Sequence, residues 1–556
     1  MFRKNDVKNE QLNLFAKEDN WTAIQRKIIN ESWYGYYHDN IFPSINEEPY
    51  RVLYSTDNAS RPNNPVNVII SLLVIKSLTG VSDEEVMNSL LFDQRVQYAV
   101  HTLNLDKQPI SKNIIGNFRN DIRKYEEKTG INLLENTMHE INDKILELHN
   151  VDRSIERMDS LMISSSCKKL SRIELIYVVN YNFIKLLKKY NKVPTEYECY
   201  LDEKNKNEVI YRTKDKEIED KLTTLISTSL NLYNEFKDDK EVCDSNEFQI
   251  LKRLIDEQYD KDNDKPKGNK DIKSNSLQTP VDPKATYRKK YGDNIGYTGN
   301  VVEAVNDGNP MITDWDIDCN TKSDSEFIKD YIGTKEKSNC EVKVEIVDGA
   351  YYSEEIKKLG EEKGITIHPT DLVGQKIDNK NLLDFNIDNE SCKILECPNN
   401  VKPISSTYNS DKHIMCAKFD KNKCMNCPFK DKCIVDSTPK KTNTLRLTTE
   451  RLNNAIIQRE RKENSEYQEI SNMRAGIEGI PSVLRRKYHI DHRGSKGEVR
   501  LKIEFSTAIL AINIKRASKI ARILVKKPLI FTKISKIKIY DSNLINLLKI
   551  NLLFGN

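Results

Sequence analysis

The stretch from residue 297 to residue 368 alternates between short β-branched runs and short helical segments, and it constrains the fold more than any other feature. Its first two runs, 297–305 and 311–317, flank the residues NDGNP, which favour a turn, so we predict a β-hairpin here. The elements expected next are a helix around 326–332, a strand at 342–347, a helix in SEEIKKLGEEKG and a strand in ITIHP. This order of strands and helices indicates a mixed α/β sheet.

The first 150 residues are predicted to be mostly helical. A long apolar run, VNVIISLLVIKSLTG, ends at Gly80, where a glycine can terminate a helix in the left-handed conformation. Ser82 and Glu85 fit a capping box, which predicts the start of a second helix. The two helices are compatible with a helix-turn-helix unit or, equally, with an ordinary helical hairpin. Two further helices are expected at 113–127 and 131–149.

Charge is distributed unevenly along the 556 residues. The net charge of +4 combines +15 from Thr438 to the C-terminus, where 25 Lys and Arg face 10 Asp and Glu, with −11 before it. The basic C-terminal quarter indicates a polyanionic partner such as nucleic acid, and the alternative is a solvated basic tail. No apolar run reaches the roughly 18–20 residues of a membrane span, and the N-terminus lacks the apolar core of a signal peptide. Eleven cysteines, an odd number, fit a reducing cytoplasm.

Two acidic residues follow short apolar stretches. Asp159 lies in ERMDSLMISS, which we predict to be a strand that ends near this residue, and Asp348 follows VKVEIV. A carboxylate at the end of a sheet strand faces the crevice where α/β proteins place ligands. Carboxylates that converge there need a cation, and Mg²⁺ or Mn²⁺ prefers such oxygen ligands. Since the chain has 84 acidic residues, a chance pair at strand ends is the alternative.

A third acidic residue lies between two arginines in NMRAGIEGIPSVLRR. Arg474, Glu478 and Arg485 are spaced so that all three would share one face of a helix. Such a face suits a site that binds metal and phosphate together, and the alternative is a row of surface ion pairs. Two glycines and Pro481 weaken the helix, so a kink is expected. The chain contains no Walker phosphate loop, GxGxxG or HExxH motif, which argues against nucleotide hydrolysis, dinucleotide binding and zincin chemistry.

Five stretches of the chain resemble, in their order, a DDE transposase of a bacterial insertion sequence, closest to the insertion-sequence eleven-eighty-two group. They are YRVLYSTDNASRPNNPVNVIISLLV, MDSLMISS, PVDPKATYRKKYGDNIGYTGNVVEAV, IVDGAYYSEE and RAGIEGIPSVLRRKYHIDHRGSKGEVRLKIEFSTAILAINIKR. The resemblance extends from about residue 50 to residue 520. It implies an α/β fold with an RNase H-like mixed-sheet catalytic core, insertions within this core, and an N-terminal all-α domain.

The resemblance also implies a role for each candidate site residue. The residues that match the DDE triad, and are expected to hold two Mg²⁺ or Mn²⁺ ions, are Asp159, Asp348 and Glu478. Related transposases carry the signature Tyr-x2-Arg-x3-Glu-x6-Lys; here Arg474 matches the arginine, Arg485 replaces the lysine and Ser471 replaces the tyrosine. The residues expected to contact DNA phosphates are Arg474, Arg485, Arg493 and Lys496. For the last two, a solvated loop is the alternative.

The reaction that the resemblance implies is Mg²⁺-dependent phosphoryl transfer on double-stranded DNA. Water cuts at the terminal repeats of the transposon and frees a 3′-OH, which attacks a phosphodiester of the target DNA. Joining two DNA ends implies a homodimer in the synaptic complex. The expected location is the bacterial cytoplasm at the nucleoid, with no membrane partner. The alternative function is that of a non-enzymatic, zinc-containing DNA-binding protein, a degenerate transposase.

Cysteines clustered between residues 397 and 433 form a second candidate site. Cys424 and Cys427 form a CxxC pair, and two more thiols would complete a tetrahedral Zn²⁺ site. The preferred ligands are Cys397, Cys424, Cys427 and Cys433, with Cys416 as a spare. The zinc would be structural, and the alternative is a compact loop with unligated thiols. The segment resembles a Cys-rich insert of the same group.

These observations divide the chain into seven parts. The predicted parts are a helical N-terminal DNA-binding domain (1–150), the first part of the RNase H-like core (151–172), a helical insertion with a linker (173–290), the core sheet with the second acid (291–383), a Cys-rich candidate zinc insert (384–440), the third-acid helix with the basic C-terminal core (441–525) and a basic tail (526–556). Within them, residues 259–285 are expected to be a flexible linker and 506–525 an amphipathic helix.

Overall fold

The computed structural model divides the chain into two compact units. The first comprises Met1–Asp152, Ser160–Lys322 and Ile480–Asn556, and the second comprises Arg153–Asp159 and Ser323–Gly479. The predicted domain 1–150 is therefore not a unit of its own. The structure describes all residues except 6–15, 58, 106, 107, 109, 112, 212, 213, 290, 291, 306–308, 337–340, 371–381, 389, 390, 411, 436–441, 450, 453, 454, 457, 458, 460–462, 492–495 and 535–556.

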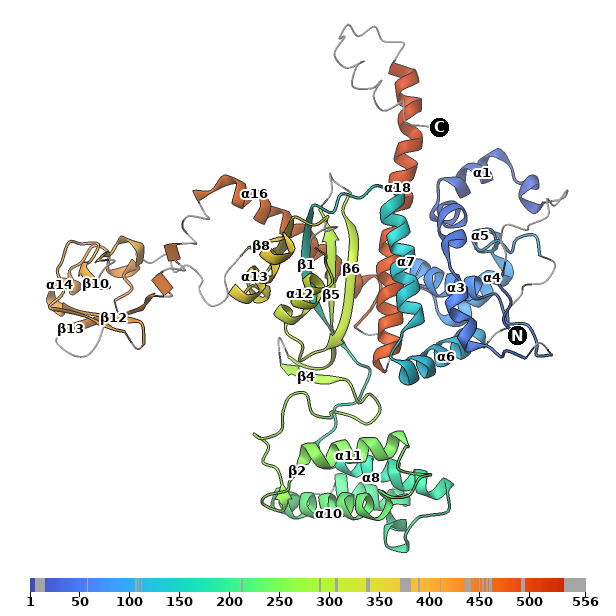
Figure 1. Ribbon diagram of the computed structural model, residues 1–556, viewed down its shortest axis with the longest axis horizontal. Helices are drawn as coiled ribbons and strands as arrows, with labels where there is room; N and C mark the ends of the chain where they lie inside the picture. Colours follow the sequence, from blue (N-terminus) through green and yellow to red (C-terminus); the bar gives the residue numbers. More distant parts are fainter. Residues whose placement is uncertain are drawn as a thin grey trace. The chain divides into compact units, whose positions relative to one another are not determined.

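An apolar helix, α3 (Val66–Thr79), forms part of the core of the first unit because most of its residues are buried. It ends at Gly80, which has a φ of 77°, as predicted for a terminating glycine. Helix α4 (Asp83–Phe92) then begins with the predicted capping box between Ser82 and Glu85. The other helices of this region are α1 (Ala23–Asn30), α2 (Trp33–Tyr36), α5 (Gln94–Ala99), α6 (Ile114–Thr129) and α7 (Leu133–Leu148) (Figure 1).

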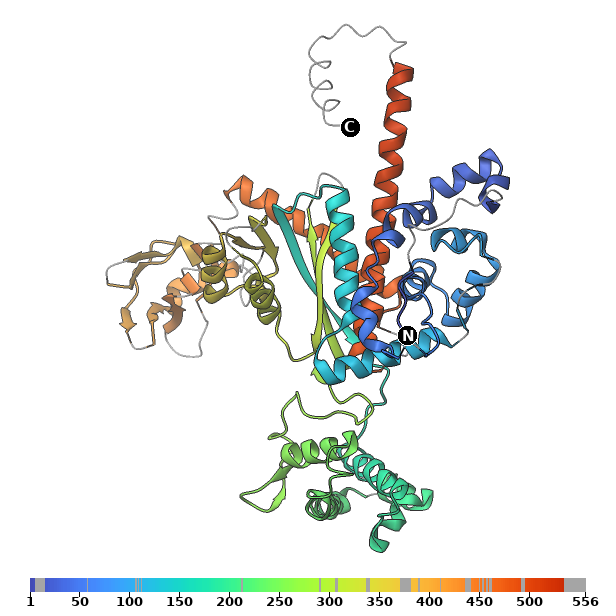
Figure 2. The same ribbon diagram turned by 45° about the vertical axis from the view of Figure 1, so that its right-hand side comes forward.

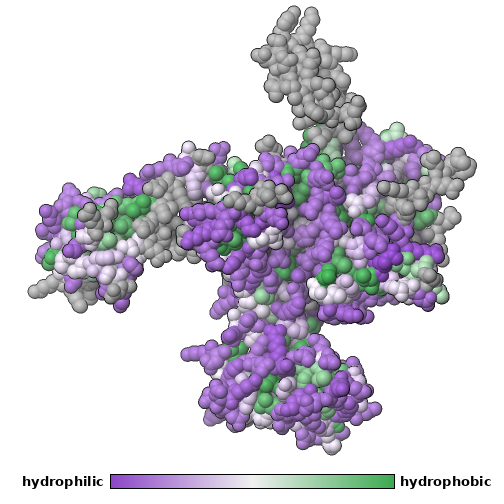
Figure 3. Space-filling model, in the orientation of Figure 1, coloured by the Kyte–Doolittle hydropathy of each residue, from purple (hydrophilic) through white to green (hydrophobic). Residues whose placement is uncertain are grey.

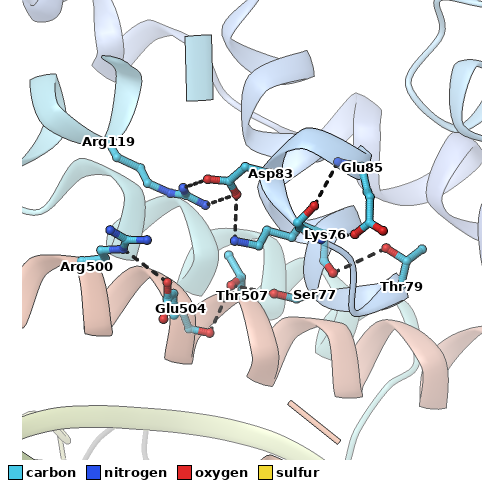
Figure 4. Close-up of polar contacts among 10 residues, drawn as sticks. Lys76, Ser77, Thr79, Asp83, Glu85, Arg119, Arg500, Glu504 and Thr507 are labelled. Atoms are coloured by element: carbon cyan, nitrogen blue, oxygen red, sulfur yellow. Dashed lines mark hydrogen bonds and ion pairs between the residues drawn. The ribbon is translucent and has the colours of Figure 1, made fainter. Parts of the chain in front are cut away.

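Helices α3 and α4 meet at an angle of 107°, which a helix-turn-helix unit would also show. The first turn of α4, however, carries Asp83, Glu84 and Glu85, whose negative charges would repel DNA phosphates. Asp83 is also held inside the unit, because it accepts hydrogen bonds from Arg119 and pairs with Lys76 at 2.7 Å (Figure 4). The structure therefore favours an ordinary helical hairpin at this position.

Helix α18 (Glu498–Ile534) connects the N-terminal helices to the sheet of the first unit (Figures 1 and 2). Ser77 of α3 donates a hydrogen bond to Thr507, and Trp315 of strand β6 (Met311–Cys319) donates one to Ser506. Residues 503–511 are all buried, so the first part of the helix predicted at 506–525 is not amphipathic, whereas Lys519 and Arg522 farther along are exposed. Because the helix packs against other elements on more than one side, it carries apolar residues around its circumference. It also extends beyond residue 525, where the basic tail was expected to begin.

The sheet of the first unit contains the predicted hairpin. Its antiparallel strands are β4 (Thr286–Lys289), β5 (Asp293–Ala304) and β6. The second half of β1 (Ile155–Ser164) lies beside β5, where an added Cβ on Gly296 would be 2.1 Å from the carbonyl oxygen of Ile163. Strand β1 was expected to end near Asp159, and this is wrong, because its pairing with β5 carries the strand on to Ser164.

In the second unit, the first half of β1 runs parallel to β7 (Val344–Val347), and β7 runs parallel to β8 (Thr366–Pro369). Helix α12 (Asp324–Gly333) precedes β7, and α13 (Glu354–Lys363) connects β7 to β8, as predicted. Since β1 belongs to both units, the strand order β4-β5-β1-β7-β8, with β6 on β5, is one mixed sheet. The prediction of a mixed α/β fold is confirmed.

A helical insertion follows β1 and has an apolar core of its own, which includes Phe183, Leu232 and Leu251. Its helices and small hairpin are α8 (Arg172–Lys189), α9 (Glu203–Ile210), α10 (Ile218–Phe236), α11 (Asn246–Gln258), β2 (Tyr259–Asp260) and β3 (Lys265–Pro266). Residues 259–285 do not form the expected flexible linker. Besides the β2–β3 hairpin, they contain Asp282, which is buried and accepts hydrogen bonds from Ser165 and Tyr297.

The Cys-rich insert forms a small β structure with a separate apolar core, in which Met415, Phe419 and Leu447 are buried. Its elements are β9 (Asn386–Asp388), β10 (Lys393–Glu396), β11 (Ser405–Asn409), β12 (Ile414–Asp420), α14 (Lys421–Met425) and β13 (Thr442–Thr448). Strand β12 pairs with both β11 and β13. The insert therefore extends to the end of β13, beyond the predicted boundary at residue 440.

No single helix among the described residues is long and apolar enough to cross a membrane, although α3 and α4 pass that test together as a bent pair. Helix α3 is mostly buried, as the core helix of a folded domain is. The face of the molecule drawn in Figure 3 is mostly hydrophilic, and its hydrophobic residues form small, separate areas.

Candidate active site

The first two acidic residues lie on neighbouring parallel strands of the second unit. Asp159 is part of β1, and Asp348 directly follows β7. Arg157 and Ile346 are partners in the strand register, so Asp159 and Asp348 each lie two positions beyond this pair. Since side chains alternate between the faces of a sheet, both carboxylates point to the same face.

The local backbone fixes the second acid. One carboxylate oxygen of Asp348 accepts a hydrogen bond from the amide of Gly349 at 2.7 Å and caps a short 3₁₀ turn, Gly349–Tyr351. The side chain of Asp348 is about half exposed (49%), whereas that of Asp159 is only 20% exposed. Asp348 is therefore the more accessible of these two acids to solvent or a ligand.

The third acid lies on a segment that is not one continuous helix. Helix α16 (Ser465–Met473) is followed directly by a 3₁₀ segment, η11 (Arg474–Glu478). Helix α17 (Gly479–Arg486) comes next. Arg474 and Glu478 still face each other, with Nη1 of Arg474 3.8 Å from Oε1 of Glu478, but η11 interrupts the α-helical periodicity from which the shared face with Arg485 was expected. The physical reason is the 3₁₀ geometry, which rotates residues by a different angle per position than an α-helix.

Arg474 lies among all three acids. Its Nη2 atom is 3.6 Å from Oδ1 of Asp159 and 3.9 Å from Oδ2 of Asp348, and its Nη1 atom is 3.8 Å from Oε1 of Glu478. Because both aspartate oxygens lie near the same nitrogen atom, they are at most 7.5 Å apart, the sum of those two distances. The structure thus brings together four of the residues that the sequence singled out.

The charges of this cluster are unbalanced. Three carboxylates and one guanidinium leave a net charge of −2, and all three ion pairs are longer than ordinary hydrogen bonds. The side chain of Arg474 is mostly buried (16% exposed), and its Nε atom has no hydrogen-bond partner in the described part of the chain. Such a set of carboxylates attracts a further cation. Among the described residues, no group of three or more His, Cys, Asp or Glu side chains is placed closely enough to hold a metal ion without rearrangement.

Residues next to the cluster on α16 are held against strand β8. Ser471, which stands at the tyrosine position of the signature, lies 2.9 Å from Nε2 of His368. Tyr467, one helical turn earlier, contacts the His368 ring at a tilt of 36° and donates a hydrogen bond to the carbonyl of Pro369. These contacts attach α16 to the sheet of the second unit.

Two of the remaining predicted DNA contacts are described by the structure. Arg485 pairs with Asp491 at 3.9 Å, and Lys496 is exposed. Arg493 lies outside the described residues. Arg157, which the sequence reasoning overlooked, is buried two positions before Asp159. The signal for it was present, since an arginine inside the short strand sequence ERMD needs a specific partner.

The four preferred zinc ligands lie around one cavity of about 220 Å³ in the Cys-rich insert. These are Cys397, Cys424, Cys427 and Cys433. Burial raises the pKa of Cys424, and the thiols of Cys433, Cys397 and Cys427 raise it further. As they are placed, the described thiols do not form a preformed metal site. Cys416 is not among the residues that line this cavity. No disulfide joins the described cysteines.

Comparison with known protein families gives one match, to the model of a Transposase DDE domain, over residues 396–518. No curated protein and no solved structure matches the chain. The matched residues include Arg474, Glu478 and the cysteines of the cavity from Cys397 onward, whereas Asp159 and Asp348 precede them. The match supports a relationship of this chain to the DDE transposases and, in general terms, a transposase function.

Proposed function

We propose that the chain is a DNA transposase, related most closely to the insertion-sequence eleven-eighty-two group, which cleaves transposon ends and transfers the 3′-OH into target DNA. The observation that carries the proposal is the convergence of Asp159, Asp348 and Glu478 on one guanidinium group. The family match over residues 396–518 supports it. An RNase H-like core is consistent with a sheet in which parallel strands β1, β7 and β8 adjoin an antiparallel group.

The chemistry of the acidic residues fits a hard divalent cation. Carboxylate oxygens are the ligands that Mg²⁺ and Mn²⁺ prefer, and the cluster carries an excess of negative charge. Asp159, Asp348 and Glu478 would hold two such ions, whose chemistry is to activate water and to stabilise the leaving oxygen of a phosphodiester. The negative charge also explains why a guanidinium group lies between the acids in the structure.

The chain's own basic residues would orient the DNA. Arg474 can turn from the carboxylates to a phosphate oxygen, because its ion pairs are long and a guanidinium binds phosphate through two parallel hydrogen bonds. Arg485, Arg493 and Lys496 are the further phosphate contacts of the proposal. They belong to the basic C-terminal quarter, which would attract the DNA backbone electrostatically.

The experiment that tests this function separates DNA binding from cleavage. In Asp348→Asn we expect Mn²⁺-dependent cleavage of transposon-end DNA to fall at least about 10²-fold while DNA binding stays within about threefold. Asp384→Asn is the matched control, because Asp384 is an exposed aspartate of the same unit outside the cluster. If neither the native protein nor the variants cut DNA with any divalent ion, but all of them bind it, the protein is a non-enzymatic DNA-binding protein.

A structural zinc ion is the second part of the proposal, and the observation that favours it is the shared cavity of the four cysteines. Protein purified without chelator should contain about one zinc ion per chain, measured by elemental analysis, and Cys424→Ser should lose it. Cys199→Ser is the control, because Cys199 is exposed and lies in the helical insertion. Absence of zinc from the native protein contradicts this part and leaves the proposal for the acids intact.

A further inference from the structure

A buried arginine lies next to the acidic cluster without belonging to it. Arg157 is only 6% exposed and lies on β1 two positions before Asp159. Because strand residues two apart share a face, its side chain is on the face of the sheet that carries Asp159. A buried guanidinium group destabilises a fold unless polar groups compensate for its lost hydration. The hydrogen bond that Arg157 makes to the segment of the third acid therefore indicates a function for this charge.

The guanidinium group of Arg157 lies against the segment that carries the third acid. Its Nη1 atom donates a hydrogen bond to the backbone carbonyl of Met473, the last residue of α16. Met473 is also the N-cap of η11, which follows α16 without a break, so this hydrogen bond holds Arg157 at the junction of the two segments. Arg157 thus connects the strand of the first acid to the backbone immediately before Arg474.

Gly476 allows this close approach. A Cβ atom at Gly476 would lie 2.3 Å from Nη1, 2.6 Å from Nη2 and 2.8 Å from Cζ of Arg157. The whole guanidinium group therefore lies flat against the backbone of η11, between the residues Arg474 and Glu478. The backbone of Gly476 does not adopt the left-handed conformation, so the glycine is required here for space and not for its φ angle.

We propose that Arg157 is a positioning residue, which holds η11 on β1 so that Glu478 and Arg474 face Asp159 and Asp348. The proposal rests on the function proposed above, because it assigns Arg157 to the same acidic site. Arg157 acts through Glu478 and Arg474, and it has no role in the reaction itself. Lysine cannot replace it, since a single ammonium group cannot cover the area on η11 that the planar guanidinium covers.

The two glycines of this segment provide a matched pair of variants. Gly476→Ala displaces the guanidinium group of Arg157, whereas a Cβ at Gly479 would meet no atom within 4 Å. Alanine favours helical backbone more than glycine does, so neither change weakens the segment by propensity. The probe is Mn²⁺ alone, whose binding to the DNA-free protein is measured by electron paramagnetic resonance, with circular dichroism as the check on folding.

We expect Gly476→Ala to weaken Mn²⁺ binding about tenfold or more and Gly479→Ala to leave it within about twofold. Glu478→Gln should weaken binding to a similar extent, and the double variant Gly476→Ala/Glu478→Gln should be no weaker than Glu478→Gln alone, because both changes remove the same ligand. A purely structural contribution of Arg157 would instead add to the effect of Glu478→Gln. Arg157→Lys should behave like Gly476→Ala.

The outcomes distinguish the two proposals. If Glu478→Gln weakens Mn²⁺ binding but Gly476→Ala does not, or if the two losses add, the positioning role of Arg157 is wrong and the acidic site stands. If the folded native protein binds no Mn²⁺, or if Glu478→Gln binds it as the native protein does, the acidic site itself is wrong, and the role of Arg157 with it.

Discussion

Nη2 of Arg474 lies 3.6 Å from Oδ1 of Asp159, although the two residues come from distant parts of the chain. The same nitrogen atom lies 3.9 Å from Asp348, and Nη1 lies 3.8 Å from Glu478. The guanidinium group is thus the counter-ion of the three acids in the DNA-free structure. This arrangement implies that divalent cations and Arg474 compete for the same carboxylates.

Replacement of Arg474 should increase the stabilisation of the folded protein by a divalent metal ion. In Arg474→Gln the three carboxylates lose their counter-ion and repel one another, so Mn²⁺ should stabilise the variant by roughly 1–2 kcal/mol more than the native protein. Thermal unfolding with and without Mn²⁺ measures the difference. Arg485→Gln is the control, since Arg485 pairs with Asp491 and not with the acids. An equal Mn²⁺ effect in the native protein and Arg474→Gln would contradict this competition.

Stability should depend on pH through Glu135 of α7. Burial raises the pKa of its carboxyl group to about 7, and the nearby Lys502 only partly offsets this. Between the ordinary value of 4.5 and about 7 the folded protein binds more protons than the unfolded chain, so this group makes stability fall as pH rises. Glu135→Gln should therefore raise the free energy of unfolding by about 1–3 kcal/mol at pH 8 and change it little at pH 4.

Denaturant unfolding at pH 4 and at pH 8 tests the role of Glu135. Glu140→Gln is the matched control, because Glu140 is an exposed glutamate of the same helix. Lys502 keeps a partner in the Glu135 variant, since it lies 3.4 Å from Glu498. If the free energy of unfolding depends on pH in the same way in Glu135→Gln and in the native protein, ionisation of Glu135 does not destabilise the folded state.

The contacts around Asp83 should hold α4 in the first unit (Figure 4). Arg119 and Lys76 lower the pKa of Asp83 well below its ordinary value, although burial acts in the opposite direction. The contribution of Asp83 to the free energy of unfolding is complete above about pH 4 and is lost as the pH falls below this value. Since the side chain of Asp83 is 41% exposed, Asp83→Asn should cost only about 1–2 kcal/mol at pH 7, measured by denaturant unfolding. Glu84 is the exposed neighbour of Asp83, and Glu84→Gln should lower the free energy of unfolding by less than about 0.5 kcal/mol. Equal effects of the two variants would contradict this role of Asp83.

Features set by short stretches of sequence were predictable. The end of α3 at Gly80, the capping box between Ser82 and Glu85 and the β5–β6 hairpin each depend on a few neighbouring residues, and the structure confirms them. The candidate acids were chosen from local patterns and from the family resemblance. The structure brings them together around Arg474, although Asp159 lies within β1 and not at its end.

Features set by distant contacts were not predictable in the same way. The length of β1 depends on its pairing with β5, and the burial of α18 depends on helices and strands that the sequence places hundreds of residues earlier. An arginine inside a short strand indicates that Arg157 needs a partner, but the sequence does not identify that partner. One of its partners, the carbonyl of Met473, is a backbone group, and no side-chain pattern near Arg157 identifies it.

The most direct test of the central claim is cleavage of duplex DNA that carries the flanks of the protein's own gene, followed in Mn²⁺ for the native protein and Glu478→Gln. The native protein should make a divalent-dependent cut at the transposon end that releases a 3′-OH, and Glu478→Gln should cut at a rate at least about 10²-fold lower with DNA binding retained. Equal cleavage by both proteins, or cleavage by the native protein without a divalent ion, would contradict the assignment of Asp159, Asp348 and Glu478 as its catalytic acids.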